Sequence, residues 1–299
     1  MLVPVCAPFL WLTLHLSPPT SPSSPPTLRP RLLSLLDTLR ANSHYAASVR
    51  TLNVELGAGE YADGSEWALV GEVAALLPDV REVDLRSDSV GRWKGIWDPF
   101  LRVVLDKGKT WERLERVSVS ALVGETGLVR RWLARHGGRV KEIDLNLTQI
   151  SSAYASQAIN ATPQQFQYDL SIVGSEEDWS LTPAKLPPPP PDEDAEDQGG
   201  LLPRTTSYRG SVATLASIFA FKPNGACPDL ATVSLECGHP FGEEARTRLC
   251  EDIETTLSGR EGAIKRLVLN GGVRPDATMV ERLGRAVGEG LRVLEMADP

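Results

Sequence analysis

Val80-Arg81-Glu82-Val83-Asp84-Leu85 is the stretch that decides the fold of this chain of 299 residues. Its apolar residues follow the pattern h-x-x-h-x-h, in which h is an apolar residue and x is any residue. The last two apolar positions, Val83 and Leu85, are two residues apart, so they lie on one face of a short strand. Asp84, which stands between them, is therefore expected on the opposite face.

The same pattern recurs along the chain. Successive copies begin 31, 34, 26, 90, 34 and 27 residues apart. A weaker copy, Gln167-Leu170-Ile172, divides the longest interval. Nearly every interval has room for a helix, and parallel strands need such a crossover, so the repeat predicts parallel strands in an α/β fold. The copies are Val49-Leu52-Val54, Val80-Val83-Leu85, Leu114-Val117-Val119, Val140-Ile143-Leu145, Leu230-Val233-Leu235, Ile264-Leu267-Leu269 and Leu291-Leu294-Met296.

Capping residues and apolar periodicity predict helices in most of these intervals. Asp63 with Glu66 makes a capping box, and Asp98-Pro99 places a cap before an N1 proline. His136 is expected near a helix C-terminus, where the helix dipole explains it. The expected core positions of three helices are Leu128, Val129, Trp132 and Leu133; Ala245, Leu249, Ile253 and Leu257; and Val280, Leu283 and Val287.

Strands and helices that alternate at a period of about thirty residues are typical of a stacked α/β solenoid. The expected form is an irregular array with a parallel sheet and outer helices. The alternative is a doubly wound sheet, which also alternates strands and helices. The solenoid is favoured because the motif is of one type and no strand is followed by a glycine-rich phosphate loop.

The segments Val49–Val54, Val80–Leu85 and Val140–Leu145 resemble the L-x-x-L-x-L core of leucine-rich repeats, in the irregular form found in F-box proteins. The resemblance covers most of residues 45–299. It implies a solenoid that binds proteins on its sheet. The asparagine or cysteine expected three residues after the last apolar position is absent, which removes the usual asparagine ladder and with it the expectation of a regular horseshoe.

Residues 1–44 are expected to form an apolar lead-in and a helix. The segment Val5–Leu16 resembles the last part of an F-box-like domain, in which a Pro-x-Leu-Trp stretch leads into a first strand. The helices that would bind the Skp adaptor of a cullin ubiquitin ligase should lie upstream, and they are missing. Either the chain is truncated or that half has been lost; alternatively, the segment is only an apolar strand that caps the core.

The acidic charge of the chain is concentrated in one insert. Residues 174–200 hold eight acidic residues and one lysine, a local charge of -7 out of a net charge of -8. A run of five prolines, Pro187–Pro191, lies within it. This composition cannot bury enough apolar surface to order itself, so a disordered loop is expected at about 174–206, interrupting the domain at 45–299.

The sequence contains no GxSxG, HExxH or P-loop motif, and its cysteines lack the spacing of a zinc site. We therefore expect a non-enzymatic binding module without a metal or cofactor. The alternative is an α/β enzyme with a loop-built site. The polar residues between core positions predict a binding row on the outer face of the strands, and Trp93 and Trp97 are candidate contact anchors. The expected row is Asn53, Asp84, Ser118, Asp144, Ser234 and Val268.

The expected partner is another protein, with the Skp adaptor as a candidate if upstream F-box helices exist. The net charge of -8 argues against a nucleic-acid-binding surface of the usual basic kind. No run of eighteen apolar residues exists, which argues against a membrane span. The apolar start, Met1–Leu16, lacks a basic n-region and a cleavage site, so a cytoplasmic or nuclear protein is expected, with secretion as the alternative.

Overall fold

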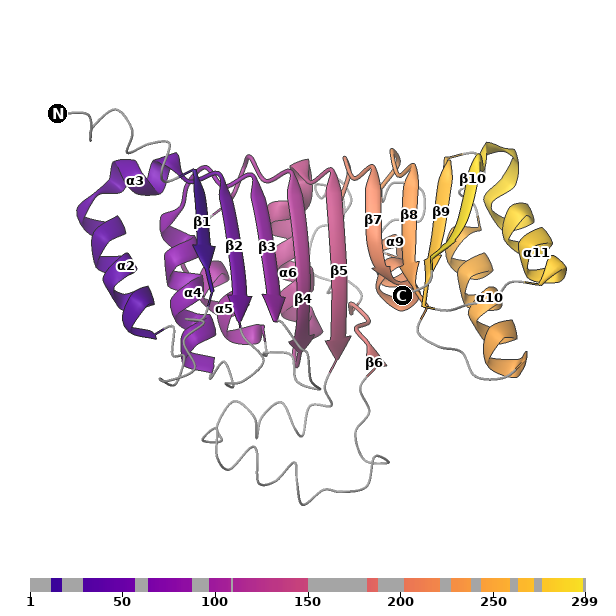
Figure 1. Ribbon diagram of the computed structural model, residues 1–299, viewed down its shortest axis with the longest axis horizontal. Coiled ribbons are helices and arrows are strands. Elements are labelled where there is room, and N and C mark those ends of the chain that lie inside the picture. The colour runs from indigo at the N-terminus through magenta and orange to yellow at the C-terminus, as the bar shows by residue number, and fades with distance from the viewer. Residues whose placement is uncertain are drawn as a thin grey trace, which may run out of the picture. The chain divides into compact units, whose positions relative to one another are not determined.

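The computed structural model describes the chain as an α/β protein in two compact units (Figure 1). Unit 1 comprises residues 1–136 and 147–184, and unit 2 comprises residues 137–146 and 185–299. The residues that the structure describes are 12–17, 29–56, 64–87, 97–108, 110–149, 182–187, 202–220, 227–237, 243–258, 263–271 and 276–297.

Unit 1 is built on four parallel strands in the order β1-β2-β3-β4. The strands are β1 (Thr13–Leu16), β2 (Thr51–Leu56), β3 (Glu82–Ser87) and β4 (Arg116–Val123). Leu52, Val83 and Val117 are direct partners across β2, β3 and β4 and are at most 1% exposed. The apolar positions of the repeated motif are thus stacked side by side and form the core.

The helices of unit 1 are α2 (Arg29–Ala41), α3 (Ser43–Ser48), α4 (Gly64–Leu76), α5 (Asp98–Asp106) and α6 (Thr126–His136). Pro99 at the start of α5 has a fixed φ suited to a first helical turn. Gly108, with φ of 64°, follows the end of α5, where a left-handed residue is common. Gly71 of α4 lies so close to α5 that an added Cβ would be 3.0 Å from Val103 Cβ.

Four tryptophans from the helices and connections of unit 1 form an aromatic cluster. Trp67, Trp97, Trp111 and Trp132 are each at most 1% exposed. The rings of Trp97 and Trp132 meet edge to face with centroids 5.5 Å apart, and Trp97 stacks on Phe100 at 6.0 Å. Aromatic pairs of this geometry stabilise a core beyond the area that they bury. These four tryptophans therefore serve packing.

Unit 2 contains the first part of β5 (Glu142–Gln149), then β7 (Ser207–Ser211), β8 (Thr232–Glu236), β9 (Arg266–Asn270) and β10 (Val293–Ala297). They pair in parallel in the order β5-β7-β8-β9-β10. The helices are α9 (Val212–Ala220), α10 (Glu243–Leu257) and α11 (Ala277–Val287), with short 3₁₀ turns at Gly137–Arg139 and Gly288–Gly290. This is again a strand–helix alternation with a parallel sheet.

One strand–helix pair of unit 2, β7 followed by α9, was not expected from the sequence. Its core-facing positions are Tyr208 and Gly210, so the apolar pattern that marks the other strands is absent. The Tyr208 hydroxyl donates a hydrogen bond to the carbonyl of Ser211 at 2.9 Å and fills the space above Gly210. The weaker copy Gln167-Leu170-Ile172, which was expected in this interval, lies outside the described residues.

The expected disordered loop at about 174–206 is described only in part. Within it, β6 (Thr182–Pro183) pairs antiparallel with Thr148 and Gln149 of β5. Ala184 is fully buried and Leu186 is 6% exposed. Leu202 and Thr205 are also fully buried, and the Thr205 hydroxyl donates to the Val140 carbonyl at 2.9 Å. The expectation of a loop over the whole range is wrong at both of these places, because apolar side chains there are buried.

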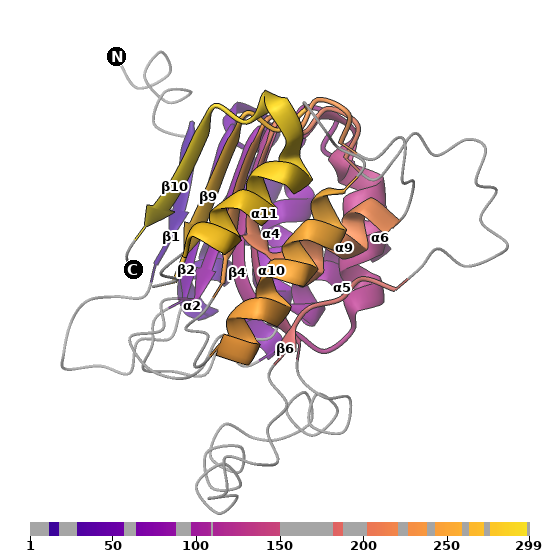
Figure 2. The same ribbon diagram turned by 90° about the vertical axis from the view of Figure 1, so that its right-hand side faces the viewer.

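In each unit the helices cover one face of the strands. Figure 1 shows α4, α5 and α6 behind the strands of unit 1, and Figure 2 shows α9, α10 and α11 on one side of the strands of unit 2. Among the described residues, no helix covers the opposite face. Parallel sheets are usually covered on both faces, so an open face needs polar side chains. The open face of each unit is therefore taken as a candidate site of its own.

Candidate functional site

The open face of unit 1 carries a row of polar residues in register. His15, Asn53, Asp84 and Ser118 are successive lateral partners on β1, β2, β3 and β4. Asn53, Asp84 and Ser118 are partly exposed, and His15 is exposed. The Asp84 carboxylate accepts a hydrogen bond from Arg86 Nε at 2.8 Å. The three row residues expected in this unit thus lie side by side on the face without helices.

The open face of unit 2 carries a second row, which includes residues that sequence reasoning missed. Asp144, Arg209, Ser234, Val268 and Glu295 are successive lateral partners from β5 to β10. The expected residues Asp144 and Ser234 are not direct neighbours, because β7 inserts Arg209 between them. Arg209 could have been found only by placing a strand at Ser207–Ser211, where alternation of exposed and core positions is the sole signal.

Hydrogen bonds link the residues of the second row to a neighbouring row. Arg209 Nε donates to Glu236 Oε1 at 2.8 Å and lies 4.0 Å from Asp144 Oδ2. Asn270 Nδ2 donates to Ser234 Oγ at 2.8 Å and to Glu236 Oε1 at 3.1 Å. The hydrogen bond to Glu236 raises the pKa of the already basic Arg209. The side chains are therefore held in fixed positions, as a recognition surface requires.

The open face of unit 2 has an excess of carboxylates. The strand positions on this face include four acidic and two basic residues. The acids are Glu142, Asp144, Glu236 and Glu295, and the bases are Arg209 and Arg266. Arg266 and Glu295 form a pair at 2.7 Å, and Arg209 is shared by two carboxylates. Four acids and two bases leave a net charge of -2 on this face. Positive groups of a partner are therefore favoured over negative ones.

The two tryptophans proposed as contact anchors do not join either row. Trp97 is fully buried within the aromatic cluster of unit 1, because its ring packs against Phe100 and Trp132. The expectation that Trp97 could contact a partner is wrong. Trp93 lies outside the described residues.

His136 is a core residue and not a charged group at a helix end. Its Nδ1 accepts a hydrogen bond from the Trp111 backbone N–H at 3.2 Å, and its ring lies 5.3 Å from that of Trp132. Burial, followed by the charge of Arg135, lowers the pKa of His136 to about 4. The imidazole is neutral at pH 7, so the explanation by the helix dipole is wrong.

Asp98 is a buried carboxylate near the carboxyl end of β4. Its two oxygens accept hydrogen bonds from the backbone N–H groups of Gly124 at 3.2 Å and Glu125 at 2.9 Å. Burial raises the pKa of Asp98 despite these bonds. Asp98 was expected to cap its own helix, and this expectation is wrong, because the N-cap residue of α5 is Trp97. The Asp98 carboxylate instead holds the segment that leads into α6. Its role is structural.

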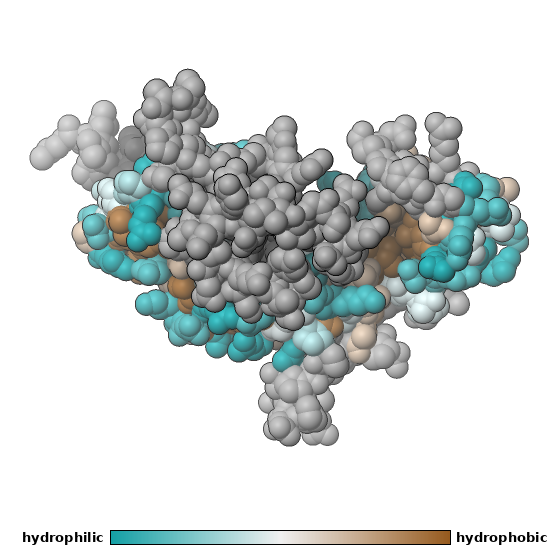
Figure 3. All heavy atoms as spheres, turned by 90° about the horizontal axis from the view of Figure 1, so that it is seen from below, coloured by the Kyte–Doolittle hydropathy of each residue, from teal (hydrophilic) through white to brown (hydrophobic). Residues whose placement is uncertain are grey.

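The end of the molecule toward which the strands point is seen in Figure 3, where hydrophilic described residues predominate and apolar ones form smaller areas. Ligand sites of open α/β sheets are usually found at this end. Cys237 directly follows β8 there. Burial and the nearby Glu236 raise the pKa of its thiol to about 12. Cys237 is therefore protonated at pH 7 and unsuited to nucleophilic catalysis.

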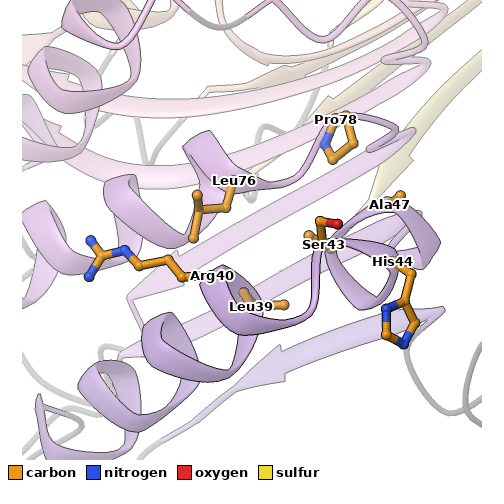
Figure 4. A pocket seen from close by; sticks show the side chains of 8 residues that line it. Leu39, Arg40, Ser43, His44, Ala47, Leu76 and Pro78 are labelled. Atoms are coloured by element: carbon orange, nitrogen blue, oxygen red, sulfur yellow. The ribbon is translucent and has the colours of Figure 1, made fainter.

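Unit 1 also has a pocket of about 530 Å³ between α2, α3 and the end of α4 (Figure 4). Its apolar lining is Leu39, Ala46, Ala47, Leu76 and Pro78. Arg40 and His44 extend away from each other at its rim, with Ser43 between them. The Arg40 guanidinium donates to Glu72 at 2.9 Å and is thus already paired. The pocket suits an apolar side chain better than a charged ligand.

Among the described residues, no group of three or more His, Cys, Asp or Glu side chains is placed to hold a metal ion. Within the same ranges, no helix is both long and apolar enough to cross a membrane. Cys250 is 3% exposed and lies on the buried side of α10, in the core of unit 2. No protein-family model matches the chain, and no curated protein matches it significantly.

Proposed function

We propose that the chain is a non-catalytic, cytoplasmic or nuclear protein that binds another protein on the open faces of its parallel strands. The repeated strand–helix units would form an irregular leucine-rich-repeat-like solenoid. The observation that carries the proposal is the lateral alignment of polar, partly exposed side chains on faces that no described helix covers. Repeat proteins use such faces as extended binding surfaces.

The state of the reactive side chains supports binding over catalysis. Asp98 is engaged by two backbone N–H groups, and His136 is neutral and buried against tryptophan rings. The Cys237 thiol has a pKa raised to about 12. Asp84, Arg209 and Ser234 instead bond to neighbouring side chains on the open face of their own unit. They offer hydrogen bonds and charge for recognition without a general base beside a nucleophile.

A more specific form of this proposal is substrate recognition for a cullin-type ubiquitin ligase. It rests on the resemblance of Val5–Leu16 to the end of an F-box-like domain, which is followed by a helical segment and then, from Val49, by the repeats. The test is association of the full chain with the Skp adaptor in purified form. A failure to associate, together with transcript evidence that Met1 is the true start, would remove the ligase role and leave the binding module untouched.

The binding proposal is tested by site-specific photocrosslinking in cells. A photoreactive amino acid is placed at Ser118 or Ser234 in the two rows, and at Asp37 or Asp252 on the exposed sides of α2 and α10 as matched controls. We expect a discrete protein adduct from the row positions that is absent from the helix positions. Adducts from the helix positions alone, or equally from all four, would refute the proposal.

Arginine substitutions then test the surface directly. Ser118→Arg and Ser234→Arg place a long charged side chain in the rows, whereas Asp37→Arg and Asp252→Arg make the same type of change on the helices. Binding of the crosslinked partner should fall by roughly tenfold or more for the first pair. It should stay within about twofold of the original chain for the second pair, because those side chains are exposed and lie off the face.

A further inference from the structure

The last strand of unit 2 is less well covered than the strands before it. The core-facing residues Val233 and Leu235 of β8 and Leu267 of β9 are fully buried, and Leu269 of β9 is 1% exposed. The corresponding residues of β10, Leu294 and Met296, are only half-buried. Among the described strands, β10 pairs with β9 alone. The apolar core of unit 2 therefore reaches the surface at an open strand edge.

The open edge of β10 has free backbone groups as well as apolar side chains. The Val293 N–H donates to the Lys265 carbonyl on the β9 side. Alternate residues of a parallel strand bond to the same neighbour, so the N–H and C=O groups of Leu294 and Met296 point away from β9. An edge of this kind pairs readily with another strand unless charge or a bulge prevents it.

Helix α11 presents an apolar flank beside this edge. Met279, Leu283 and Val287 face the core, and Arg282 on one side of this stripe bonds to Glu254 of α10. At 100° per residue, Val280 and Gly284 lie on the other side, away from α10. Val280 was expected in the core from the sequence and is instead 42% exposed. The side of α11 that carries Val280 and Gly284 is thus apolar, and no described residue covers it.

Gly284 marks a place for a neighbouring helix. A glycine inside a helix lowers its stability and usually has a packing reason. In α4 the reason is close packing, since a Cβ added at Gly71 would lie 3.0 Å from Val103 Cβ and 3.1 Å from the Phe100 carbonyl oxygen of α5. At Gly284 an added Cβ would meet no described atom within 4 Å. Gly284, like Gly71, is a glycine inside a helix, but no described helix packs against it.

We propose that this flank, defined by β10 with Val280 and Gly284 of α11, binds the same flank of a second copy of the chain. A two-fold axis perpendicular to the plane of the sheet makes β10 antiparallel to β10 of the other copy and pairs Leu294 with Leu294 of that copy. The same axis makes the two α11 helices antiparallel, so that each Val280 is placed over the Gly284 of its mate. The protruding Val280 and the gap at Gly284 are one helical turn apart on the same flank, so the surface is complementary to itself.

The charges on the outer side of α11 are also compatible with this dimer. Glu281 and Arg285 form an exposed pair at 2.8 Å within the helix. In an antiparallel arrangement each Glu281 comes toward the Arg285 of the other copy, so opposite charges meet on both sides of the axis. The dimer closes on itself and removes the open edge. The proposal concerns unit 2 alone and does not depend on the partner of the open faces.

The test is the mass of the purified full chain by sedimentation equilibrium over about 1 to 100 µM, the range in which a small interface associates. We expect a reversible monomer–dimer equilibrium. Val280→Glu should weaken the dimer by about tenfold or more. Leu33→Glu is the matched control, because Leu33 is 45% exposed on α2 of unit 1. It should leave the equilibrium unchanged.

Gly284→Gln separates an interface role from a structural one. Glutamine has the higher helix propensity and open space around it, so the thermal midpoint of the monomer should rise by ~2–4 °C. The same side chain fills the gap that Val280 of the other copy needs, so the dimer should be lost. A monomer at every concentration overturns the proposal. So does open-ended polymerisation, or a dimer that Val280→Glu and Gly284→Gln leave intact.

Discussion

Gly210→Ala is the substitution whose effect on unit 2 follows most directly from the geometry. Gly210 lies in β7 with φ of 149°, a value that residues with a side chain rarely adopt. A Cβ at this position would be 2.4 Å from the Leu145 carbonyl oxygen and 2.6 Å from the Tyr208 hydroxyl. The first contact is with backbone of the paired strand β5, so a rotation of one side chain does not relieve it.

The magnitude is the sum of two costs and one gain. Backbone strain of this kind costs about 1–3 kcal/mol, and overpacking of a core costs another 1–3 kcal/mol. The reduced freedom of the unfolded chain returns about 0.4–1 kcal/mol. Unit 2 should therefore lose about 1–6 kcal/mol, a large part of the 5–15 kcal/mol that is typical of a folded domain.

The assay is urea unfolding followed by far-ultraviolet circular dichroism, with hydrogen exchange of the Ser207–Ser211 peptide to locate the effect. Gly108→Ala carries strain without a clash, because φ is 64° and no described atom lies within 4 Å of the added Cβ. Gly138→Ala carries neither. We expect the loss of stability to fall in the order Gly210, Gly108, Gly138. If Gly210→Ala is within about 0.5 kcal/mol of Gly138→Ala, the argument from close contact is refuted.

Two further predictions concern the aromatic cluster of unit 1. The folded-state pKa of His136 is lowered from 6.5 to about 4, so its contribution is fully present above pH 6.5 and is lost as the pH falls toward 4. The loss amounts to about 3 kcal/mol; urea unfolding at pH 7 and pH 4.5 should show a smaller difference for His136→Gln than for the unchanged chain, and equal differences would contradict the assignment. Trp111→Phe should cost about 1–3 kcal/mol more than Trp132→Phe, because Trp111 Nε1 donates to the Leu77 carbonyl at 3.1 Å whereas Trp132 Nε1 is buried without a described partner. Thermal unfolding of the two variants measures this difference, and a larger loss for Trp132→Phe would show that the indole hydrogen bond is not the deciding contact.

The period-two apolar pattern was sufficient to predict the strands that carry it. Val83 and Leu85 lie in the core and Asp84 lies on the open face, as their alternation requires. The class of fold followed from the spacing between copies. The prediction failed at β7, because Tyr208 bends back over Gly210 and one large side chain occupies the space of two apolar ones. The contact lies within one strand, but Ser207–Ser211 lacks the h-x-x-h-x-h pattern by which the other strands were predicted.

Residues whose environment depends on distant elements were assigned less well. Helical periodicity cannot distinguish Met279 from Val280 as the core residue, since the two differ by 100° and both are apolar. The outcome was decided by the position of α10, which Arg282 contacts through Glu254. Likewise His136 is near a helix end in sequence, but Trp111 and Trp132 enclose it. The rows were predictable in part, because Asn53, Asp84 and Ser118 needed only strand register.

The uneven distribution of tryptophan between the two units allows the unfolding of unit 1 to be followed separately by intrinsic fluorescence. All seven tryptophans fall within the residues of unit 1, and unit 2 contains Tyr208 as its single strong near-ultraviolet chromophore of the tyrosine or tryptophan type. Intrinsic emission excited at the red edge of indole absorption therefore reports on unit 1 alone, whereas backbone dichroism reports on both. A difference between the two melting curves would measure directly how independently the two units unfold, without a label or a truncation.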